Sequence, residues 1–336
     1  MKRIGNLYEK VCSIENLQLA DEKARKGKLR TYGVIEHDKK REVNLLKLRE
    51  TLLNGTFHTS KYDVFTIYEP KEREIYRLPY FPDRILHHAI MNVLEPIWVS
   101  TFTADTYSCI KNRGIHAAAK KVKQALREDP EGTTFCLKLD IRKFYPSINH
   151  DVLKSILRRK LKDKRLLRLL DEIIDSADGV PIGNYLSQYF ANLYLTYFDH
   201  WIKEQKRVKH YFRYADDIVI LASDKSYLHS LMGEIRAYLG DLKLEVKGNW
   251  QVFPVAARGI DFVGYVFFHT HTRMRKGIKK TFCLRLAKLN KRKRPLSEKD
   301  FKQAICPWWG GAKSCDSKHL IKKLSKTSKY EIKFKR

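Results

Sequence analysis

The sequence predicts an α+β fold whose strands come from distant parts of the 336-residue chain. Apolar residues alternate over 133–141 and again over 211–221, with the period of a half-buried strand. Around these segments apolar residues recur at helical spacing. This mixed order of strands and helices indicates α+β, and the length indicates two or three lobes.

The first third of the chain is predicted to be mainly helical. Residues 36–53 have the pattern of a charged amphipathic helix that stops at Asn54–Gly55. Residues 62–68 alternate loosely, as a strand entering a turn does. A helix over 85–94 is expected to end before Pro96, because proline disfavours the helical conformation of its predecessor.

The middle of the chain alternates between strand and helix signals. A helix over 115–126 follows the break at Asn112–Gly114. In the strand over 133–141, Lys138 and Asp140 share one face, opposite Leu137 and its apolar neighbours. Helices are expected over 151–176, and an aromatic-rich helix over 189–202.

The last third is predicted to contain short strands followed by helices. Two strands meet at a turn within 211–221, and residues 262–268 form another strand. Amphipathic helices are expected in the C-terminal segment from their apolar spacing. The apolar residues concerned are Leu284, Leu286, Leu289, Leu320, Ile321 and Leu324.

The charge of the chain predicts a polyanionic partner. Lys and Arg number 67 against 38 acids, a net +29, and residues 271–336 alone contain 22 basic and 4 acidic residues. Such an excess favours nucleic acid first and an anionic membrane surface second. Aromatic residues lie between the basic ones, which suits phosphate contact combined with stacking. They are Phe301, Trp308, Trp309, Tyr330 and Phe334. The alternative is a solvated, disordered tail, and the helical apolar spacing favours the folded interpretation.

Cysteine usage and hydropathy indicate a reducing, cytoplasmic setting. The six cysteines form no CxxC, and the group Cys306, Cys315 and His319 matches no standard zinc spacing. Unpaired thiols are therefore expected. No apolar run near the amino end or elsewhere suits a signal peptide or a membrane span of about 18 residues. We therefore expect a protein without membrane attachment.

Three carboxylates are the candidate catalytic groups. Asp140 ends a hydrophobic strand in LDIRKFYPS, and Asp216 and Asp217 lie in YADDIVIL. Adjacent carboxylates repel unless a cation compensates them, and magnesium prefers oxygen ligands. Two such ions can clamp both oxygens of an in-line displacement at phosphorus. The alternative is that each motif only occupies a solvent-facing turn or caps an element.

These segments resemble the motifs of reverse transcriptases. LDIRKFYPSI is similar to the first catalytic motif, and Tyr214–Asp217 to the second. KEREIYRLPYFPDRI resembles the fingers, YSCIKNRGIHAA the next block, and FVGY at Phe262–Tyr265 the primer grip. The resemblance implies a right-hand polymerase with an antiparallel palm sheet and a basic helical thumb. Fingers with an N-terminal extension would occupy residues 1–130, the palm 131–270 and the thumb 271–336.

One segment narrows the resemblance. Group II intron and retron enzymes have a QGxxxSP-like pattern where GVPIGNYLSQ stands here, with Ile182 in place of Gln and Gln188 in place of Pro. The IGxxxSQ form is similar to reverse transcriptases of diversity-generating retroelements. That subfamily implies copying of a retroelement RNA into cDNA with errors at template adenines. It also implies a small basic oligomeric accessory protein, and a cytoplasmic enzyme of bacterial, archaeal or phage origin.

The resemblance also implies roles for individual residues. Asp140, Asp216 and Asp217 would be catalytic and, with the backbone carbonyl of Ile141, would bind two Mg²⁺ ions, for which Mn²⁺ is an alternative. Deoxynucleoside triphosphates would be bound by Lys71, Arg77, Tyr145, Ile182, Gly183 and Gln188. The primer grip would comprise Phe262, Val263, Gly264 and Tyr265. Lys243 and Lys247 are candidates for a proton donor to pyrophosphate.

Four of these residues have a structural alternative. Tyr145, expected to exclude the ribose 2′-hydroxyl, could be a core ring, as its neighbour Phe144 could be. Lys71 and Arg77 could be solvated surface charges, and Ile182 could only pack beneath the site. For the whole chain, the alternatives are a group II intron-like or retron-like reverse transcriptase, and a non-catalytic RNA-binding protein with a polymerase fold.

Overall fold

The computed structural model describes residues 3–68 and 72–330, and its chain forms two compact units. The first unit comprises Met1–Ala104, Ile141–Lys206 and Arg236–Val246. The second comprises Asp105–Asp140, Arg207–Ile235 and Lys247–Arg336. The fingers, palm and thumb boundaries drawn from the sequence stay predictions.

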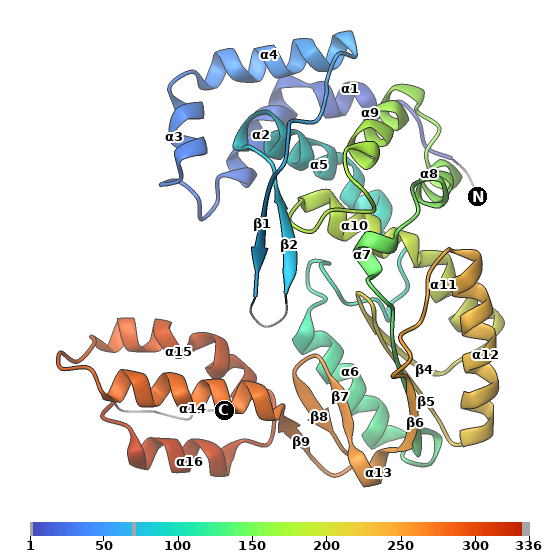
Figure 1. The fold of residues 1–336 in the computed structure, drawn as a ribbon, viewed down its shortest axis with the longest axis vertical. Helices are drawn as coiled ribbons and strands as arrows, with labels where there is room; N and C mark the ends of the chain where they lie inside the picture. Colours follow the sequence, from blue (N-terminus) through green and yellow to red (C-terminus); the bar gives the residue numbers. More distant parts are fainter. Residues whose placement is uncertain (1–2, 69–71, 331–336) are drawn as a thin grey trace. The chain divides into compact units, whose positions relative to one another are not determined.

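The first unit is mainly helical, with one strand pair (Figure 1). Its buried residues include Leu17, Leu45, Leu48 and Ile90, which the helices turn away from solvent. The helices are α1 (Tyr8–Cys12), α2 (Ile14–Ala24), α3 (Tyr32–Asp38), α4 (Arg41–Asn54), α5 (Ile85–Val99), α7 (Phe144–Ser147), α8 (His150–Lys160), α9 (Lys164–Asp175), α10 (Tyr185–Tyr194) and α11 (Thr196–His200). Two π-helical turns, Tyr80–Arg84 and Trp201–Gln205, adjoin α5 and α11.

An antiparallel ribbon extends from this unit. Strand β1 (Asp63–Ile67) pairs with β2 (Arg73–Arg77), so that Asp63 lies opposite Arg77. Most of its side chains are exposed. The backbone amide of Tyr76 donates to the carbonyl of Ile182 at 2.8 Å. The ribbon is thereby attached to the segment that precedes α10.

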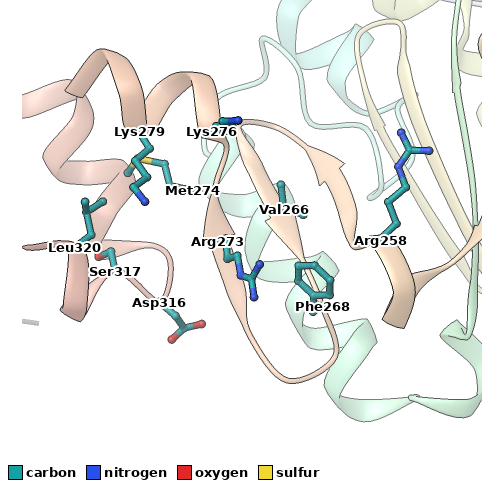
Figure 2. A pocket seen from close by; sticks show the side chains of 10 residues that line it. All are labelled: Arg258, Val266, Phe268, Arg273, Met274, Lys276, Lys279, Asp316, Ser317 and Leu320. Atoms are coloured by element: carbon teal, nitrogen blue, oxygen red, sulfur yellow. The ribbon is translucent and has the colours of Figure 1, made fainter. Parts of the chain in front are cut away.

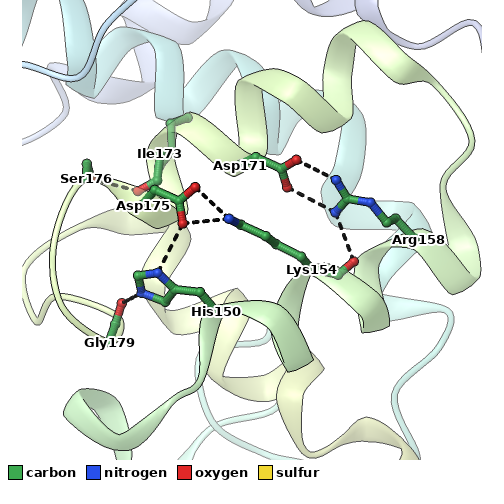
Figure 3. A network of polar contacts seen from close by, with 8 residues as sticks. All are labelled: His150, Lys154, Arg158, Asp171, Ile173, Asp175, Ser176 and Gly179. Atoms are coloured by element: carbon green, nitrogen blue, oxygen red, sulfur yellow. Dashed lines mark hydrogen bonds and ion pairs between the residues drawn. The ribbon is translucent and has the colours of Figure 1, made fainter.

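Ion pairs join α8 to α9 and fix the loop that follows them (Figure 3). Arg158 donates to both carboxylate oxygens of Asp171, and Lys154 to both oxygens of Asp175. His150 contacts Asp175 at 3.1 Å through Nδ1 and donates from Nε2 to the carbonyl of Gly179 at 2.8 Å. Such fork-like contacts are the geometrically specific kind of ion pair.

The second unit contains two antiparallel sheets (Figure 1). The larger has the order β4 (His210–Tyr214), β5 (Asp217–Ala222), β3 (Phe135–Asp140) and β6 (Gln251–Pro254). The smaller joins β7 (Ile260–Phe262), β8 (Tyr265–Phe267) and β9 (Thr272–Met274). Helix α6 (Ile115–Glu128) packs on β4 and β8 through Ala118, Ala119 and Val122. A short helix, α13 (Val255–Arg258), connects β6 to β7.

The basic C-terminal segment folds into three helices around an apolar core. They are α14 (Lys276–Asn290), α15 (Glu298–Lys313) and α16 (Lys318–Thr327). Phe282, Leu286, Ile305 and Ile321 are buried among them, as amphipathic helices require. The predicted amphipathic helices are thus confirmed, although Leu284 is 60% exposed.

The aromatic residues of this segment mostly serve packing. Phe301 is buried and stacks on Tyr330 with ring centres 4.2 Å apart. Trp308 lies parallel to Phe282 at 6.3 Å. Phe334 lies outside the described residues. Stacking of Phe301 on nucleic acid, expected from the sequence, is therefore wrong, because the ring is enclosed by its own helices.

Several predicted boundaries are wrong for identifiable reasons. The helix over 36–53 is two helices, α3 and α4, separated at Lys39–Lys40. Helix α5 continues through Pro96 to Val99. Proline inside a helix costs about 3 kcal/mol. Burial of Trp98, which packs against aromatic rings of α10, offsets that cost.

Other elements differ from the sequence analysis in extent. The aromatic-rich helix begins at Tyr185 rather than Tyr189 and is interrupted at Leu195. The strand over 262–268 is two strands, because Val263 and Gly264 form a turn with positive φ. Strand β6 and helix α12 (Lys225–Asp241) were not predicted.

No helix among residues 3–68 and 72–330 has both the length and the apolar character needed to cross a membrane. The six cysteines, all in the described part of the chain, are unpaired, as expected.

Candidate active site

A tight hairpin presents two of the candidate carboxylates. Strands β4 and β5 are joined by Ala215 and Asp216, and Tyr214 pairs with Asp217 to close the loop. Ala215 has φ 55°, the left-handed conformation used by two-residue hairpin loops. The buried Arg213 donates to the carbonyl of Ala215 at 3.1 Å and holds this conformation. The loop therefore fixes both aspartates at the start of β5.

The third carboxylate comes from the neighbouring strand. Asp140 is the last residue of β3 and lies directly opposite Asp217 in the antiparallel pairing. It is also close enough to Asp216 to raise the pKa of that carboxyl. The second unit thus brings together one aspartate and an adjacent pair of aspartates from two well-separated parts of the sequence.

Burial and mutual repulsion change the acidity of this group. Desolvation, followed by the hydrogen bond to and the repulsion from Asp140, raises the pKa of Asp216 to about 7. Burial also raises the pKa of Asp217, while the nearby Lys138 opposes that rise. Two carboxylates this close cannot both be ionised cheaply, so the acids in this arrangement hold a proton that a cation could replace.

Two lysines neutralise part of the negative charge. Lys247 Nζ lies 2.6 Å from Asp140 Oδ2, and Lys138 Nζ lies 3.2 Å from Asp217 Oδ1. Lys138 also donates to the carbonyl of Asp261. Asp140 Oδ1 is buried and accepts no hydrogen bond, and Asp217 Oδ1 accepts none either but has the Lys138 ammonium as its ion-pair partner. Buried polar atoms without partners are rare and point to an ion or ligand.

The donor chemistry fits magnesium, although no ready-made metal cage exists. Within residues 3–68 and 72–330, no three His, Cys, Asp or Glu side chains are arranged to hold a metal ion as they stand. The two oxygens without hydrogen bonds, and the Asp216 carboxylate once it has lost its proton, are hard oxygen donors of the kind that Mg²⁺ prefers. Lys138 and Lys247 supply positive charge where a divalent cation would supply it.

The residues predicted to bind the nucleotide lie in the first unit. Arg77 ends β2, pairs with Asp63, and its guanidinium lies over the Phe65 ring at 5.6 Å from the centroid. Its side chain is 65% exposed. Lys71, the other predicted phosphate ligand, lies outside the described residues. Arg77 is therefore accessible to a phosphate but already has an acidic partner.

Backbone contacts fix three further predicted nucleotide residues. The carbonyl of Tyr145 accepts from Val180 at 2.9 Å, and the carbonyl of Ile182 accepts from Tyr76 at 2.8 Å. Gly183 has φ +127°, and a Cβ there would meet the carbonyl oxygen of Tyr76 at 2.6 Å. Only glycine satisfies both the dihedral and the close approach.

The other two residues predicted to bind nucleotide or metal, Gln188 and Ile141, differ in burial. Gln188 is an exposed position on α10, whereas Ile141 is buried and bridges to Val246. Ile141 belongs to the first unit and Asp140 to the second.

The predicted primer grip is the β7–β8 hairpin. Phe262 and Tyr265 pair across it and are buried in the core. Val263 and Gly264 form its loop with φ 44° and 90°. The carbonyl of Gly264 accepts from Arg275 at 3.0 Å. The two aromatic rings therefore support the hairpin, and only its loop is available to a ligand.

Sequence reasoning missed part of the charged surroundings. Asp261 pairs with Arg275 and accepts from Lys138, and neither Asp261 nor Arg275 was singled out. The alternation of β3 already placed Lys138 on the face of Asp140, which was a usable signal. Lys247 was considered only as a proton donor, while Lys243 is exposed.

The fold is shared with a polymerase of known structure. Telomerase from Candida Tropicalis, solved in complex with a TWJ fragment of telomeric RNA, superposes with a TM-score of 0.50 at 12% identity. The match covers 82% of this chain and 56% of that one. At this identity the likeness concerns the fold alone, and it agrees with the predicted polymerase fold class.

Sequence relatives include two bacterial proteins. Protein YkfC of Escherichia coli (strain K12) is 26% identical over 279 residues, which are 69% of this chain and 73% of YkfC. Group II intron-encoded protein LtrA of Lactococcus lactis subsp. cremoris is 23% identical over 191 residues, or 52% of this chain. The match spans only 31% of LtrA.

A family model described as reverse transcriptase (RNA-dependent DNA polymerase) matches residues 69–267. The match is more than half of the chain and contains the β3 strand end and the β4–β5 hairpin. The match confirms the predicted enzyme class. The chain therefore belongs to the reverse transcriptase family.

Proposed function

We propose that this chain adds deoxynucleotides to a primer on an RNA template. The observation that carries the proposal is the grouping of Asp140, Asp216 and Asp217 in one site, where the buried Asp140 Oδ1 has no hydrogen bond. When bound, two Mg²⁺ ions, or Mn²⁺ in their place, would activate a 3′-hydroxyl and stabilise the leaving pyrophosphate. The net charge of +29 suits the polyanionic template and product.

Different residues of the chain would bind the metal ions, hold a phosphate and select the sugar. The three aspartates and the carbonyl of Ile141 would provide oxygen ligands, and the stiff β3–β5 pairing would keep two of them in fixed register. Arg77 would hold a phosphate through its planar guanidinium. The ring of Tyr145, anchored through its backbone to Val180, would leave no room for a ribose 2′-hydroxyl.

Primer extension tests this function directly. The wild-type chain should extend a DNA primer on an RNA template with Mg²⁺, and Asp216→Ala should lose incorporation by at least about 10²–10³-fold. Asp224→Asn, an exposed acid beyond β5, is the matched control and should retain activity. RNA binding without incorporation by the wild-type chain, or full activity in Asp216→Ala, would support the non-catalytic alternative.

We further propose that the enzyme serves a diversity-generating retroelement. The support is the IGxxxSQ form around Ile182, which resembles that of reverse transcriptases of diversity-generating retroelements. Isoleucine cannot donate a hydrogen bond, so base selection would be looser opposite template adenine. The subfamily also implies a small basic oligomeric accessory protein, whose capture by the chain with template RNA can be measured by co-purification.

A group II intron-type function is the second candidate. The similarity to group II intron-encoded LtrA favours it. An enzyme of that type should prefer a structured intron RNA as template and copy adenines faithfully. Competition between an intron RNA and an unrelated RNA of equal length, followed by sequencing of the cDNA, separates the two candidates.

A further inference from the structure

The small sheet of the second unit has one face open to solvent. Strand alternation buries Tyr265 and Phe267 on the inner face. Val266 and Arg273, which pair across β8 and β9, lie on the outer face. The outer face is the floor of a cavity of about 470 Å³, whose wall on one side is formed by α14 and the start of α16 (Figure 2).

The size of this cavity limits its ligand. Ligand pockets for single small molecules have about 300–1,000 Å³. A cavity of about 470 Å³ is therefore of the size that one nucleotide would occupy. Figure 2 shows Arg273 and Phe268 on its floor and Lys276 and Lys279 on the helical side.

The cavity carries an excess of positive charge, because four basic side chains and one acid line it. In the described part of the chain, the side chains of Lys276 and Lys279 make no hydrogen bond and no ion pair, and Arg273 pairs with no acid. Asp316 is the one acid lining the cavity, and its Oδ2 already accepts the backbone amide of Thr272 at 2.9 Å. Unpaired cations around a concave surface favour a phosphate-bearing ligand.

An aromatic stack lies beside these cations. The rings of Phe268 and His271 are stacked with centres 4.6 Å apart at 12°. The Arg273 guanidinium lies over the Phe268 ring at 5.2 Å from its centroid. Bases of single strands stack on aromatic rings and on arginine planes in this manner. Because His271 and Arg273 already cover the Phe268 ring, a base would stack on the outer plane of the Arg273 guanidinium, within reach of the cations that would bind its phosphates.

The cavity is connected to the catalytic carboxylates through one residue. A second cavity, of about 200 Å³, is lined by Asp140, Lys138 and Asp261. Arg258 lines both cavities. The two cavities therefore share Arg258 within the second unit.

We propose that this cavity binds one nucleotide of a single-stranded nucleic acid, outside the catalytic centre. Lys276 and Lys279 contact its phosphates, and the Phe268–Arg273 pair contacts its base. The site is separate from the loop of the predicted primer grip, Val263–Gly264. That the bound strand is a template or product rests on the proposed function. Binding of the strand itself needs neither a metal ion nor a nucleoside triphosphate.

Fluorescence anisotropy in EDTA, without deoxynucleotides, tests the site. The probes are labelled oligouridylate, oligothymidylate and a duplex of the same length, each titrated at several salt concentrations. Phe268→Ala should weaken binding of the single strands roughly tenfold with an unchanged salt slope, because it removes stacking alone. Phe268→Leu keeps an apolar side chain over Gly259 but removes the flat ring. It should therefore weaken binding of the single strands about as much as Phe268→Ala does.

The charge variant has a matched control. Lys276→Ala with Lys279→Ala should reduce the slope of log K against log salt by about 0.7 for each phosphate that is no longer neutralised. Lys280→Ala with Lys288→Ala removes the same charge from exposed positions of α14 that do not line the cavity. An equal reduction in both pairs, or equal affinity for the duplex, would overturn the proposal.

A further variant distinguishes failure of the cavity proposal from failure of the proposed polymerase function. Asp216→Ala should bind the oligonucleotides as the wild type does while losing primer extension. Unchanged binding in the Phe268 and lysine variants refutes the cavity proposal even if extension is normal. The tighter of the oligouridylate and oligothymidylate complexes identifies RNA or DNA as the bound strand.

Discussion

Lys247 is bound to Asp140 twice: its Nζ lies 2.6 Å from Asp140 Oδ2, and its backbone amide donates to the Asp140 carbonyl at 2.9 Å. The ammonium therefore occupies one side of a carboxylate whose other oxygen is buried without a hydrogen bond. Divalent cations and this lysine would compete for the same negative charge.

Replacing Lys247 by an uncharged residue should strengthen the binding of a divalent cation at Asp140. We expect Lys247→Met to bind Mn²⁺ about tenfold more tightly, the partial exposure of the pair limiting the Coulomb term. Titration followed by electron paramagnetic resonance of free Mn²⁺ measures this affinity. Lys243→Met removes an equal charge from an exposed position nearby in sequence and should change little. Weaker Mn²⁺ binding in Lys247→Met would contradict the competition.

The raised pKa of Asp216 predicts a pH-dependent stability without metal. Its carboxyl titrates near 3.8 in the unfolded chain and near 7 in the fold, so the fold binds the additional proton. The resulting stabilisation is complete below about pH 4 and is lost as the pH rises towards and through 7. Thermal unfolding in EDTA across this range should show Tm falling, with Asp216→Asn showing a smaller fall.

Magnesium should reverse that trend. Binding must displace the proton of Asp216, so Mg²⁺ should raise Tm more above pH 7 than below it. The same increase at every pH would argue against protonation of this site.

Gly183 holds the first unit's ribbon against the segment before α10. Gly183→Ala should destabilise the fold by about 1–3 kcal/mol, because its Cβ would collide with the Tyr76 carbonyl and φ is +127°. Gly240→Ala, where a Cβ meets nothing within 4 Å, is the control and should be neutral or stabilising. Thermal unfolding of both variants measures the difference, and equal Tm values would contradict the requirement for glycine.

The residue at position 182 is predicted to set fidelity. Ile182→Gln should reduce misincorporation opposite template adenine, because the amide can hydrogen-bond where isoleucine cannot. Sequencing of cDNA copied from an adenine-containing RNA gives the error spectrum. Ile182→Leu, which keeps an apolar side chain, serves as the control. An unchanged spectrum in Ile182→Gln would discard the idea that this residue loosens selection.

Local sequence patterns were sufficient to predict many of the helices and strands and to single out the three candidate aspartates. The alternation around Asp140 and the turn around Asp216 come from short-range backbone preferences, which the sequence displays directly. The same holds for the amphipathic C-terminal helices, where Phe282 and Ile321 are buried at helical spacing. The predicted ends of helices were wrong where contacts with distant residues outweighed the local preference. Pro96, for example, lies within α5 because Trp98 is buried.

The sequence by itself determined the α+β class, the polymerase motifs, the basic C-terminal helices and the identity of the three acids. Only the tertiary structure decided that Asp140 lies opposite Asp217, that Lys138 and Lys247 accompany them, and that unpaired cations surround the cavity beside Phe268. The physical reason is that strand register and burial arise from contacts between distant segments, and a linear pattern does not encode those distances.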